Sequence, residues 1–228
     1  MAEPVRPIGA VLFDLDGTLL DTAPDLAGAL NRLRARHGHP PLPYASIRPF
    51  ASHGSFALTR LGFDYAEDSP EFESTRLALL DVYHAHVADE TTLFPGMDAL
   101  LRAIEQAGLR WGIVTNKPGW LTEPLLAKLD LGLMPACVVS GDTLPERKPH
   151  PAPLLYAAER IDCAPASCLY VGDAARDIEA GKRAGMQTLV AAYGYIGPDD
   201  DPLAWEADGI VASPADIATW LALNLSPA

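Results

Sequence analysis

From residue 93 onward, short apolar runs alternate with stretches in which apolar residues recur at the spacing of a helix. The apolar runs predict strands at 109–114, 136–139, 168–171 and 186–190, and the stretches around them predict helices at 95–107, 118–130, 151–160 and 174–184. Gly108, Gly132 and Gly185 stand where three of these helices end. Alternating strands and helices predict a parallel sheet with helices on both faces. The apolar run at 8–13 is a further strand, so the sheet joins the two ends of the chain.

Residues 20–92 show a different pattern. Apolar positions recur with helical period in 25–36 and 71–87, and no convincing strand is present. The predicted fold class is therefore α/β, a doubly wound parallel sheet with a Rossmann-like core, interrupted after its first strand by a small all-helical insertion. This organisation assigns residues 1–19 and 93–228 to the α/β core and residues 20–92 to the insertion, with hinges at 18–22 and 89–94.

The first strand ends in two acids, Asp14 and Asp16, within the stretch VLFDLDGTLL. Asp-Gly between apolar runs is also typical of a hairpin turn, which remains the alternative from the local sequence. A calcium loop would need glycine and glutamate at positions where this sequence has other residues. The residues after Leu20 favour a helix, since Thr22 can cap it and Asp25 completes a capping box. We therefore expect strand, loop and helix, with both acids at the carboxyl end of a strand.

Charge and composition narrow the class of partner. The 228 residues are 49% hydrophobic, and the formal net charge is −13. Such a charge opposes binding to nucleic acid or to an anionic membrane, and no apolar run is long enough to span a membrane. Three cysteines without C-x-x-C spacing indicate reduced thiols and a cytoplasmic protein. We expect a monomer or homodimer that acts on a small molecule.

Polar residues follow three of the predicted strands. Asp14 and Asp16 follow the first, Thr115-Asn116-Lys117 follow 109–114, and Gly172-Asp173 with Asp177 follow 168–171, while Lys148 lies just ahead of a helix. Open parallel sheets bind ligands beyond the carboxyl ends of their strands. Converging carboxylates repel one another unless a cation lies among them, and hard oxygen ligands select Mg²⁺. A cation, a lysine and a hydroxyl together suit a phosphoryl group, which an aspartate can attack.

Four short motifs, in this order and spacing, resemble those of the haloacid dehalogenase superfamily. They are Asp14 to Leu19 (DLDGTL), Thr115-Asn116, Lys148-Pro149 and Gly172 to Asp177 (GDAARD). The helical insertion resembles the smaller type of cap in that superfamily, so the resemblance covers nearly the whole chain. It is closest to the phosphoglycolate phosphatases and the N-acetylmuramic acid 6-phosphate phosphatases, particularly in the stretches at 111–118 and 193–202. The resemblance implies a phosphatase rather than a dehalogenase, because a dehalogenase needs no acid at Asp16.

The resemblance also implies a role for each motif residue. Asp14 would be the nucleophile and Asp16 the acid and base, with Thr115 and Lys148 completing the catalytic set and Thr18 and Asn116 binding phosphate. The metal ligands would be Asp14, Asp16 through its backbone carbonyl, and Asp173, with Asp177 holding metal-bound waters. The implied substrate is a small phosphorylated metabolite, and the implied cofactor is Mg²⁺.

Selectivity must come from the insertion, because the motifs contact only the phosphoryl group. The candidate stretch is 50–56, where Gly54 lets the backbone approach a ligand and Ser52, His53 and Ser55 could contact the substrate. The alternative is a helix start capped by Ser52 or Ser55. Arg48 and Arg60 flank it and could pair with a substrate carboxylate, although surface salt bridges would explain both arginines as well. We therefore expect a carboxylate-bearing phosphomonoester, with phosphoglycolate slightly favoured over a phosphosugar acid.

Two other functions share part of this pattern. A receiver-type signalling module also clusters acids, a hydroxyl and a lysine around a phosphorylated aspartate, but it needs neither Asp16 nor an insertion of this length. A hexose phosphate mutase shares every motif, and only an isomerisation assay separates it. A histidine metal site is not expected, since His84 and His86 lie two apart on a helix and point to different faces.

Overall fold

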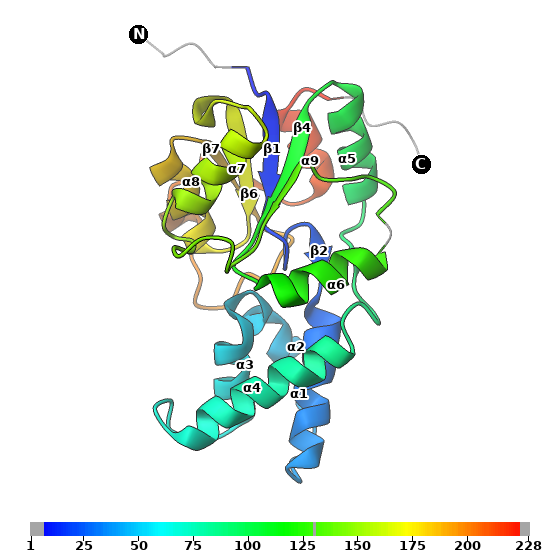
Figure 1. The fold of residues 1–228 in the computed structure, drawn as a ribbon, viewed down its shortest axis with the longest axis vertical. Coiled ribbons are helices and arrows are strands. Elements are labelled where there is room, and N and C mark those ends of the chain that lie inside the picture. Colours follow the sequence, from blue (N-terminus) through cyan, green and yellow to red (C-terminus); the bar gives the residue numbers. More distant parts are fainter. Residues whose placement is uncertain (1–6, 130, 224–228) are drawn as a thin grey trace.

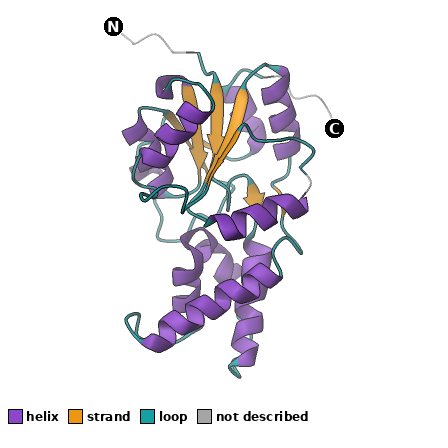
Figure 2. Cartoon of the chain, in the orientation of Figure 1, coloured by secondary structure: helices purple, strands orange, loops and turns teal. Residues whose placement is uncertain are grey.

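A six-stranded parallel sheet lies at the centre of the α/β part of the molecule (Figures 1 and 2). The structure is a computed structural model, and it describes residues 7–129 and 131–223. The strand order is β5-β4-β1-β6-β7-β8. The strands are β1 (Ala10–Phe13), β4 (Arg110–Val114), β5 (Cys137–Val139), β6 (Cys168–Gly172), β7 (Gln187–Ala191) and β8 (Gly209–Val211). The chain passes from β1 to β4 on one side and later to β6 on the other, so the order reverses at β1. A ligand site is expected at such a reversal.

The strand register brings the predicted motifs together. Phe13 pairs with Ile113 of β4 and with Val171 of β6. The residues just beyond these three strands therefore lie at one edge of the sheet, and the backbone N–H of Asp14 donates to the Val171 carbonyl at 2.9 Å. This register is the physical reason that motifs far apart in the chain meet at one place.

Helices cover both faces of the sheet, which confirms the doubly wound fold. They are α5 (Met97–Gln106), α6 (Gly119–Leu129), α7 (Ala152–Arg160), α8 (Ala175–Ala184) and α9 (Pro214–Trp220). Alternate residues of β1 belong to different cores: Val11 and Phe13 pack on the side of α5 and α9, while Ala10 and Leu12 pack on the side of α7 and α8. The four predicted helices of this part agree with α5 to α8 within two residues at each end, whereas β8 and α9 were not predicted.

The helical insertion forms the other half of the molecule (Figure 2). Its helices are α1 (Ala23–Arg36), α2 (Tyr44–Ile47), α3 (Gly54–Gly62) and α4 (Pro70–Ala85), and a 3₁₀ helix at Arg48–His53 joins α2 to α3. The two long patterns at 25–36 and 71–87 predicted α1 and α4 correctly. Further 3₁₀ turns lie at Pro165–Ser167 and Pro202–Trp205. No helix among the described residues combines the length and the apolar character needed to cross a membrane.

The prediction that residues 20–92 lack strands is wrong at the start of this range, where a short strand lies. Its partner strand lies where the range ends. β2 (Leu20–Asp21) and β3 (Thr92–Leu93) pair in an antiparallel ribbon. Strands of two residues are too short to show alternation, so the sequence pattern could not reveal them. The ribbon places the outgoing and the returning chain side by side.

The capping box predicted at the start of α1 is also wrong. The Thr22 hydroxyl makes no cap hydrogen bond and donates to Asp16 Oδ1 at 2.6 Å. The Asp25 carboxylate accepts from the backbone N–H groups of Glu90 and Thr91, at 2.9 and 3.0 Å, and from the Thr91 hydroxyl at 2.6 Å. Both side chains therefore join the two connections between the halves of the molecule instead of closing the helix end.

Candidate active site

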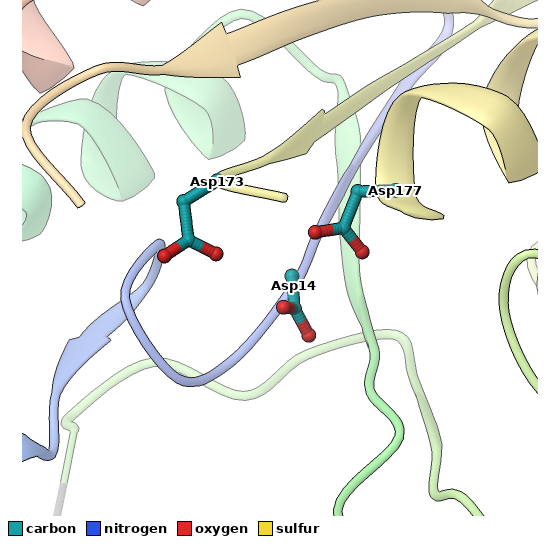
Figure 3. A group of neighbouring side chains, drawn as sticks. All are labelled: Asp14, Asp173 and Asp177. Atoms are coloured by element: carbon teal, nitrogen blue, oxygen red, sulfur yellow. The ribbon is translucent and has the colours of Figure 1, made fainter. Parts of the chain in front are cut away.

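Three buried aspartates converge beyond the ends of β1 and β6 (Figure 3). Asp14 follows β1, Asp173 follows β6, and Asp177 lies in the first turn of α8. Carboxylate oxygens of all three lie within 4.8 Å of one another. The side chains are nearly inaccessible to solvent. The spacing of the first and fourth motifs therefore predicted a real cluster.

The cluster strongly disfavours its own negative charge. Burial raises the pKa of Asp173 to about 7, with Asp14 and Asp177 adding to the effect. Burial likewise raises the pKa of Asp14 to about 6, against the opposing influence of the Lys148 ammonium. Oδ1 of Asp173 is buried without a hydrogen-bond partner among the described residues. An orphaned carboxylate oxygen beside two further acids fits a divalent cation with oxygen ligands.

Lys148 supplies the positive charge within the cluster. Its ammonium lies 2.8 Å from Asp14 Oδ1 and 2.7 Å from Asp177 Oδ1. It also donates to the Val114 carbonyl at 2.9 Å and to the Tyr170 hydroxyl at 2.8 Å. Burial opposes this charge, but the two carboxylates outweigh it, so the pKa of Lys148 is raised. Lys148 therefore stays charged next to Asp14.

The carboxylate of Asp177 is occupied by Lys148 and by the backbone. Its Oδ1 pairs with Lys148, and its Oδ2 accepts from the backbone N–H of Ala174 at 3.1 Å. Asp14 and Asp173 each have a buried Oδ1 without a hydrogen-bond partner among the described residues, and that of Asp14 lies 2.8 Å from the Lys148 ammonium.

Asp16 points toward the helical insertion. Its Oδ1 accepts from the Thr22 hydroxyl and, at 3.0 Å, from the Lys117 ammonium. That ammonium also donates to the hydroxyl of Tyr83 on α4 at 2.9 Å and lies 4.4 Å from the centre of its ring. Lys117 was not singled out as a site residue from the sequence. Its place directly after Thr115-Asn116, at the same strand end, is the signal that could have revealed it.

The stretch 50–56 does reach the acids, but through Ser52. The Ser52 hydroxyl lies 2.6 Å from Asp173 Oδ2 and 3.3 Å from the backbone oxygen of Asp16. Arg176 of α8 donates to the Ser52 carbonyl and lies 3.5 Å from Nδ1 of His53. Neither Ser52 nor Ser55 caps α3, whose N-cap is His53. Arg176, which lies inside the fourth motif, is thus a further site residue that the sequence analysis passed over.

A cavity of about 670 Å³ extends from Asp14 and Asp16 toward the insertion. Seven of the predicted site residues line it: Asp14, Asp16, Thr115, Asn116, His53, Gly54 and Ser55. Lys148, Asp173 and Asp177 lie outside its lining, and all three are buried.

Thr18 and Asn116, both predicted to bind phosphate, lie in different surroundings. Thr18 is fully buried and lies outside the cavity lining. The Asn116 amide donates to the Lys148 carbonyl at 2.9 Å and accepts from the Lys148 N–H at 3.0 Å. Asn116 therefore joins the loops of the second and third motifs.

The two arginines expected to meet a substrate carboxylate lie elsewhere. Arg48 donates to the Tyr193 carbonyl at 3.1 Å and stacks on the Tyr195 ring. Arg60 pairs with Glu67 on the surface and lines a separate, smaller cleft. Neither side chain lines the cavity, because a position beside 50–56 in the chain does not decide which way a side chain faces; for Arg60 the surface ion pair is the alternative that the sequence left open. Arg76 of α4 lines the cavity instead.

Known proteins resemble this chain over most of its length. The sequence profile of haloacid dehalogenase-like hydrolases matches residues 11–191. A phosphoglycolate phosphatase of Xanthomonas campestris pv. campestris is 45% identical over 214 residues, covering 92% of this chain and 96% of that protein. An N-acetylmuramic acid 6-phosphate phosphatase of Pseudomonas aeruginosa is 43% identical over 208 residues, covering 91% of this chain and 92% of that protein. A crystal structure from Haemophilus somnus, described as a predicted phosphoglycolate phosphatase, has a TM-score of 0.80 at 27% identity and covers 93% of this chain and 97% of that one.

Proposed function

The chain belongs to the haloacid dehalogenase-like hydrolase family and is a phosphomonoester hydrolase, and from this premise we propose a Mg²⁺-dependent phosphatase that works through an aspartyl phosphate on Asp14. One observation carries the proposal. Asp14 lines the cavity and lies 2.8 Å from the Lys148 ammonium, within the cluster formed with Asp173 and Asp177. A carboxylate held in this way is aimed at the space where a phosphoryl group would enter.

The chemistry divides between two aspartates. A carboxylate oxygen of Asp14 attacks phosphorus, and the bond from phosphorus to the substrate oxygen breaks. Asp16, which also lines the cavity, gives its proton to the departing oxygen. It then takes a proton from the water that hydrolyses the aspartyl phosphate. Lys148 offsets negative charge on Asp14 and on the phosphoryl oxygens during both steps.

The acids are suited to a bound Mg²⁺ ion. Asp14, the backbone carbonyl of Asp16 and Asp173 would hold it, and Asp177 would contact its waters. When bound, Mg²⁺ supplies positive charge to the phosphoryl oxygens. The orphaned Oδ1 of Asp173 is the feature of this chain that favours such a ligand set.

We propose that residues 20–92 act as a cap over a core of residues 1–19 and 93–228, and that the substrate carries a carboxylate besides its phosphate. The Xanthomonas relative is named for phosphoglycolate and the Pseudomonas relative for N-acetylmuramic acid 6-phosphate. Both compounds are acids with a single phosphomonoester. The two names therefore support a carboxylate-bearing phosphomonoester as the substrate class, without favouring either compound.

Rapid acid quench with a ³²P-labelled phosphomonoester and Mg²⁺ tests the mechanism. We expect sustained phosphate release together with a transient label on the protein that hydroxylamine removes. Asp14→Asn should show neither, whereas the control Asp64→Asn, at an exposed position on the insertion, should show both. A stoichiometric label without turnover would mean a receiver-like module, and turnover without any label would mean direct attack by water.

A further inference from the structure

The two carboxylate oxygens of Asp173 lie in different surroundings. Oδ2 accepts hydrogen bonds from the Tyr195 N–H at 2.9 Å and from the Ser52 hydroxyl at 2.6 Å, whereas Oδ1 is buried without a hydrogen-bond partner among the described residues. Figure 3 shows one oxygen of Asp173 directed toward Asp14 and Asp177 and the other directed away from them. The two donors on Oδ2 therefore fix the plane of this carboxylate and leave its other oxygen for a ligand.

The backbone of the core encloses the same carboxylate. A Cβ added at Gly17 would overlap Asp173 Oδ2, and one added at Gly194 would overlap the Asp173 side chain near its own Cβ. Gly17 also has a φ of +83°, which a residue with a side chain rarely adopts. These two close approaches restrict where the Asp173 side chain can move, so its orientation is decided by the few groups that touch it.

One of those groups belongs to the helical insertion. Ser52 lies in the 3₁₀ helix at Arg48–His53, and its hydroxyl is closer to Asp173 Oδ2, at 2.6 Å, than to the backbone oxygen of Asp16, at 3.3 Å. A serine hydroxyl has one proton to donate, so the shorter contact is the hydrogen bond. The insertion thus supplies one of the two donors that orient a carboxylate of the core.

Further contacts hold this 3₁₀ helix against the core. At its start, Arg48 donates to the Tyr193 carbonyl at 3.1 Å, and its guanidinium lies 4.9 Å from the centre of the Tyr195 ring. Near its end, Arg176 of α8 donates to the Ser52 carbonyl. The 3₁₀ helix is therefore docked on the core at both ends, and the position of the Ser52 hydroxyl depends on this docking.

From these contacts we propose that Ser52 is a positioning residue for the metal site, which orients Asp173 so that Oδ1 is free to bind the ion and thereby couples metal binding to the placement of the insertion. The inference rests on the Mg²⁺ site of the proposed function and adds to it a residue outside the four motifs. Groups that orient a metal ligand contribute a factor of about 10 to 100 to metal affinity. By thermodynamic linkage, bound metal favours the docked 3₁₀ helix by the factor that the Ser52 contact adds to metal affinity.

Binding of Mn²⁺, followed through the electron paramagnetic resonance signal of the free ion, tests this role without turnover. Mn²⁺ takes the same oxygen ligands as Mg²⁺, and in the wild type without substrate we expect binding that Mg²⁺ competes away. Ser52→Ala should raise the Kd for Mn²⁺ by about tenfold or more. Ser52→Thr keeps the hydroxyl and should bind Mn²⁺ more tightly than Ser52→Ala.

Ser55→Ala is the matched control. Ser55 is half-buried like Ser52 and lines the same cavity, but its hydroxyl accepts from Arg76 Nη1 of α4, at 3.2 Å. The Kd of Ser55→Ala for Mn²⁺ should therefore equal that of the wild type.

Hydrogen–deuterium exchange measures the coupling from the side of the insertion. In the wild type, Mg²⁺ should slow deuterium uptake by peptides that cover 48–53, because the ion favours the docked helix. In Ser52→Ala, at a Mg²⁺ concentration that saturates both proteins, the slowing should be smaller.

The contrary outcomes are distinct. An unchanged Kd in Ser52→Ala, or an equal rise in Ser55→Ala, would overturn the role of Ser52 while the metal site stands. Tighter Mn²⁺ binding by Ser52→Ala would also overturn it, since the hydroxyl would then occupy the space of the ion. Uptake at 48–53 that does not respond to Mg²⁺ in the wild type would overturn the coupling. A wild type that binds neither Mn²⁺ nor Mg²⁺ would overturn the metal site of the proposed function and this inference with it.

Discussion

Replacing Asp173 with asparagine should change how the stability of the metal-free protein depends on pH. Asp173 is 2% exposed, and its pKa rises from 3.8 to about 7 because of burial and the neighbouring Asp14 and Asp177. The ionised carboxylate is therefore costly in the folded state. Asparagine has the same shape, stays neutral, and can still accept the hydrogen bonds that Asp173 Oδ2 receives from Ser52 and from the Tyr195 N–H.

The size and sign of the effect come from the pKa shift. A change from 3.8 to about 7 is about three pK units, or about 4 kcal/mol at about 1.36 kcal/mol per unit. Because the pKa is higher in the folded state, the stabilising contribution of Asp173 is complete below pH 3.8 and is lost as the pH rises through about 7. About one of these three pK units of stabilisation is lost between pH 3.8 and pH 5, which leaves about two units for the range above pH 5. Between pH 5 and pH 8, Asp173→Asn should therefore gain about 3 kcal/mol in free energy of unfolding relative to the wild type.

Urea unfolding in EDTA, followed by tryptophan fluorescence from pH 5 to pH 8, measures this difference. The control Asp64→Asn removes an exposed acid and should run parallel to the wild type. Mg²⁺ at pH 8 should stabilise the wild type more than Asp173→Asn, because the ion binds only the folded site. A difference between Asp173→Asn and wild type that stays constant or shrinks as the pH rises would refute the assignment of a raised pKa to Asp173.

The remaining predictions concern turnover of p-nitrophenyl phosphate and the stability of the buried cluster. Asp14→Asn should reduce kcat to background, since an amide is a poor nucleophile; a near wild-type rate would exclude Asp14. Asp16→Asn should lower kcat by about 10² to 10⁴, and unchanged kinetics would place the acid elsewhere. EDTA should abolish turnover, Mg²⁺ should restore it, and Ca²⁺ should restore it poorly. Full activity in EDTA would contradict the proposed metal requirement. Lys148→Met leaves two buried carboxylates without their cation and should lower the free energy of unfolding, measured in urea at pH 7.5, by about 3–5 kcal/mol. A decrease below about 1 kcal/mol would argue against the ion pairs.

The sheet was predictable because its pattern is locally strong. The central strands β1, β4 and β6 are buried along nearly their whole length, so each is an apolar run that ends abruptly in polar residues. β8 and α9 escaped prediction because only one residue of β8, Val211, is buried and α9 spans only seven residues. An edge strand carries a weak apolar signal.

The acids were predictable for a related reason. The predicted parallel pairing puts the residues after neighbouring strands at one edge, so Asp14, Thr115 and Asp173 had to meet once the strands were assigned. No comparable rule predicts which side chains of the helical insertion face the site. On a helix, residues three or four apart share a face. Which of Arg48, Arg60 and Arg76 faces the cavity depends on how the 3₁₀ helix at Arg48–His53, α3 and α4 pack together, which local patterns do not encode.

The failure of the capping box shows how the two halves are joined. Thr22 and Asp25 have the residue types and spacing of a helix start, yet each makes contacts across the junction that compete with the cap. Asp25 accepts three hydrogen bonds from Glu90 and Thr91, more than the single backbone donor that it could satisfy within its own helix. Thr22 bonds to Asp16, which also binds Lys117 and, through it, Tyr83 of α4. Asp16 is therefore held by Thr22 at the junction and, through Lys117, by Tyr83 of the insertion, so its position depends on where the insertion lies.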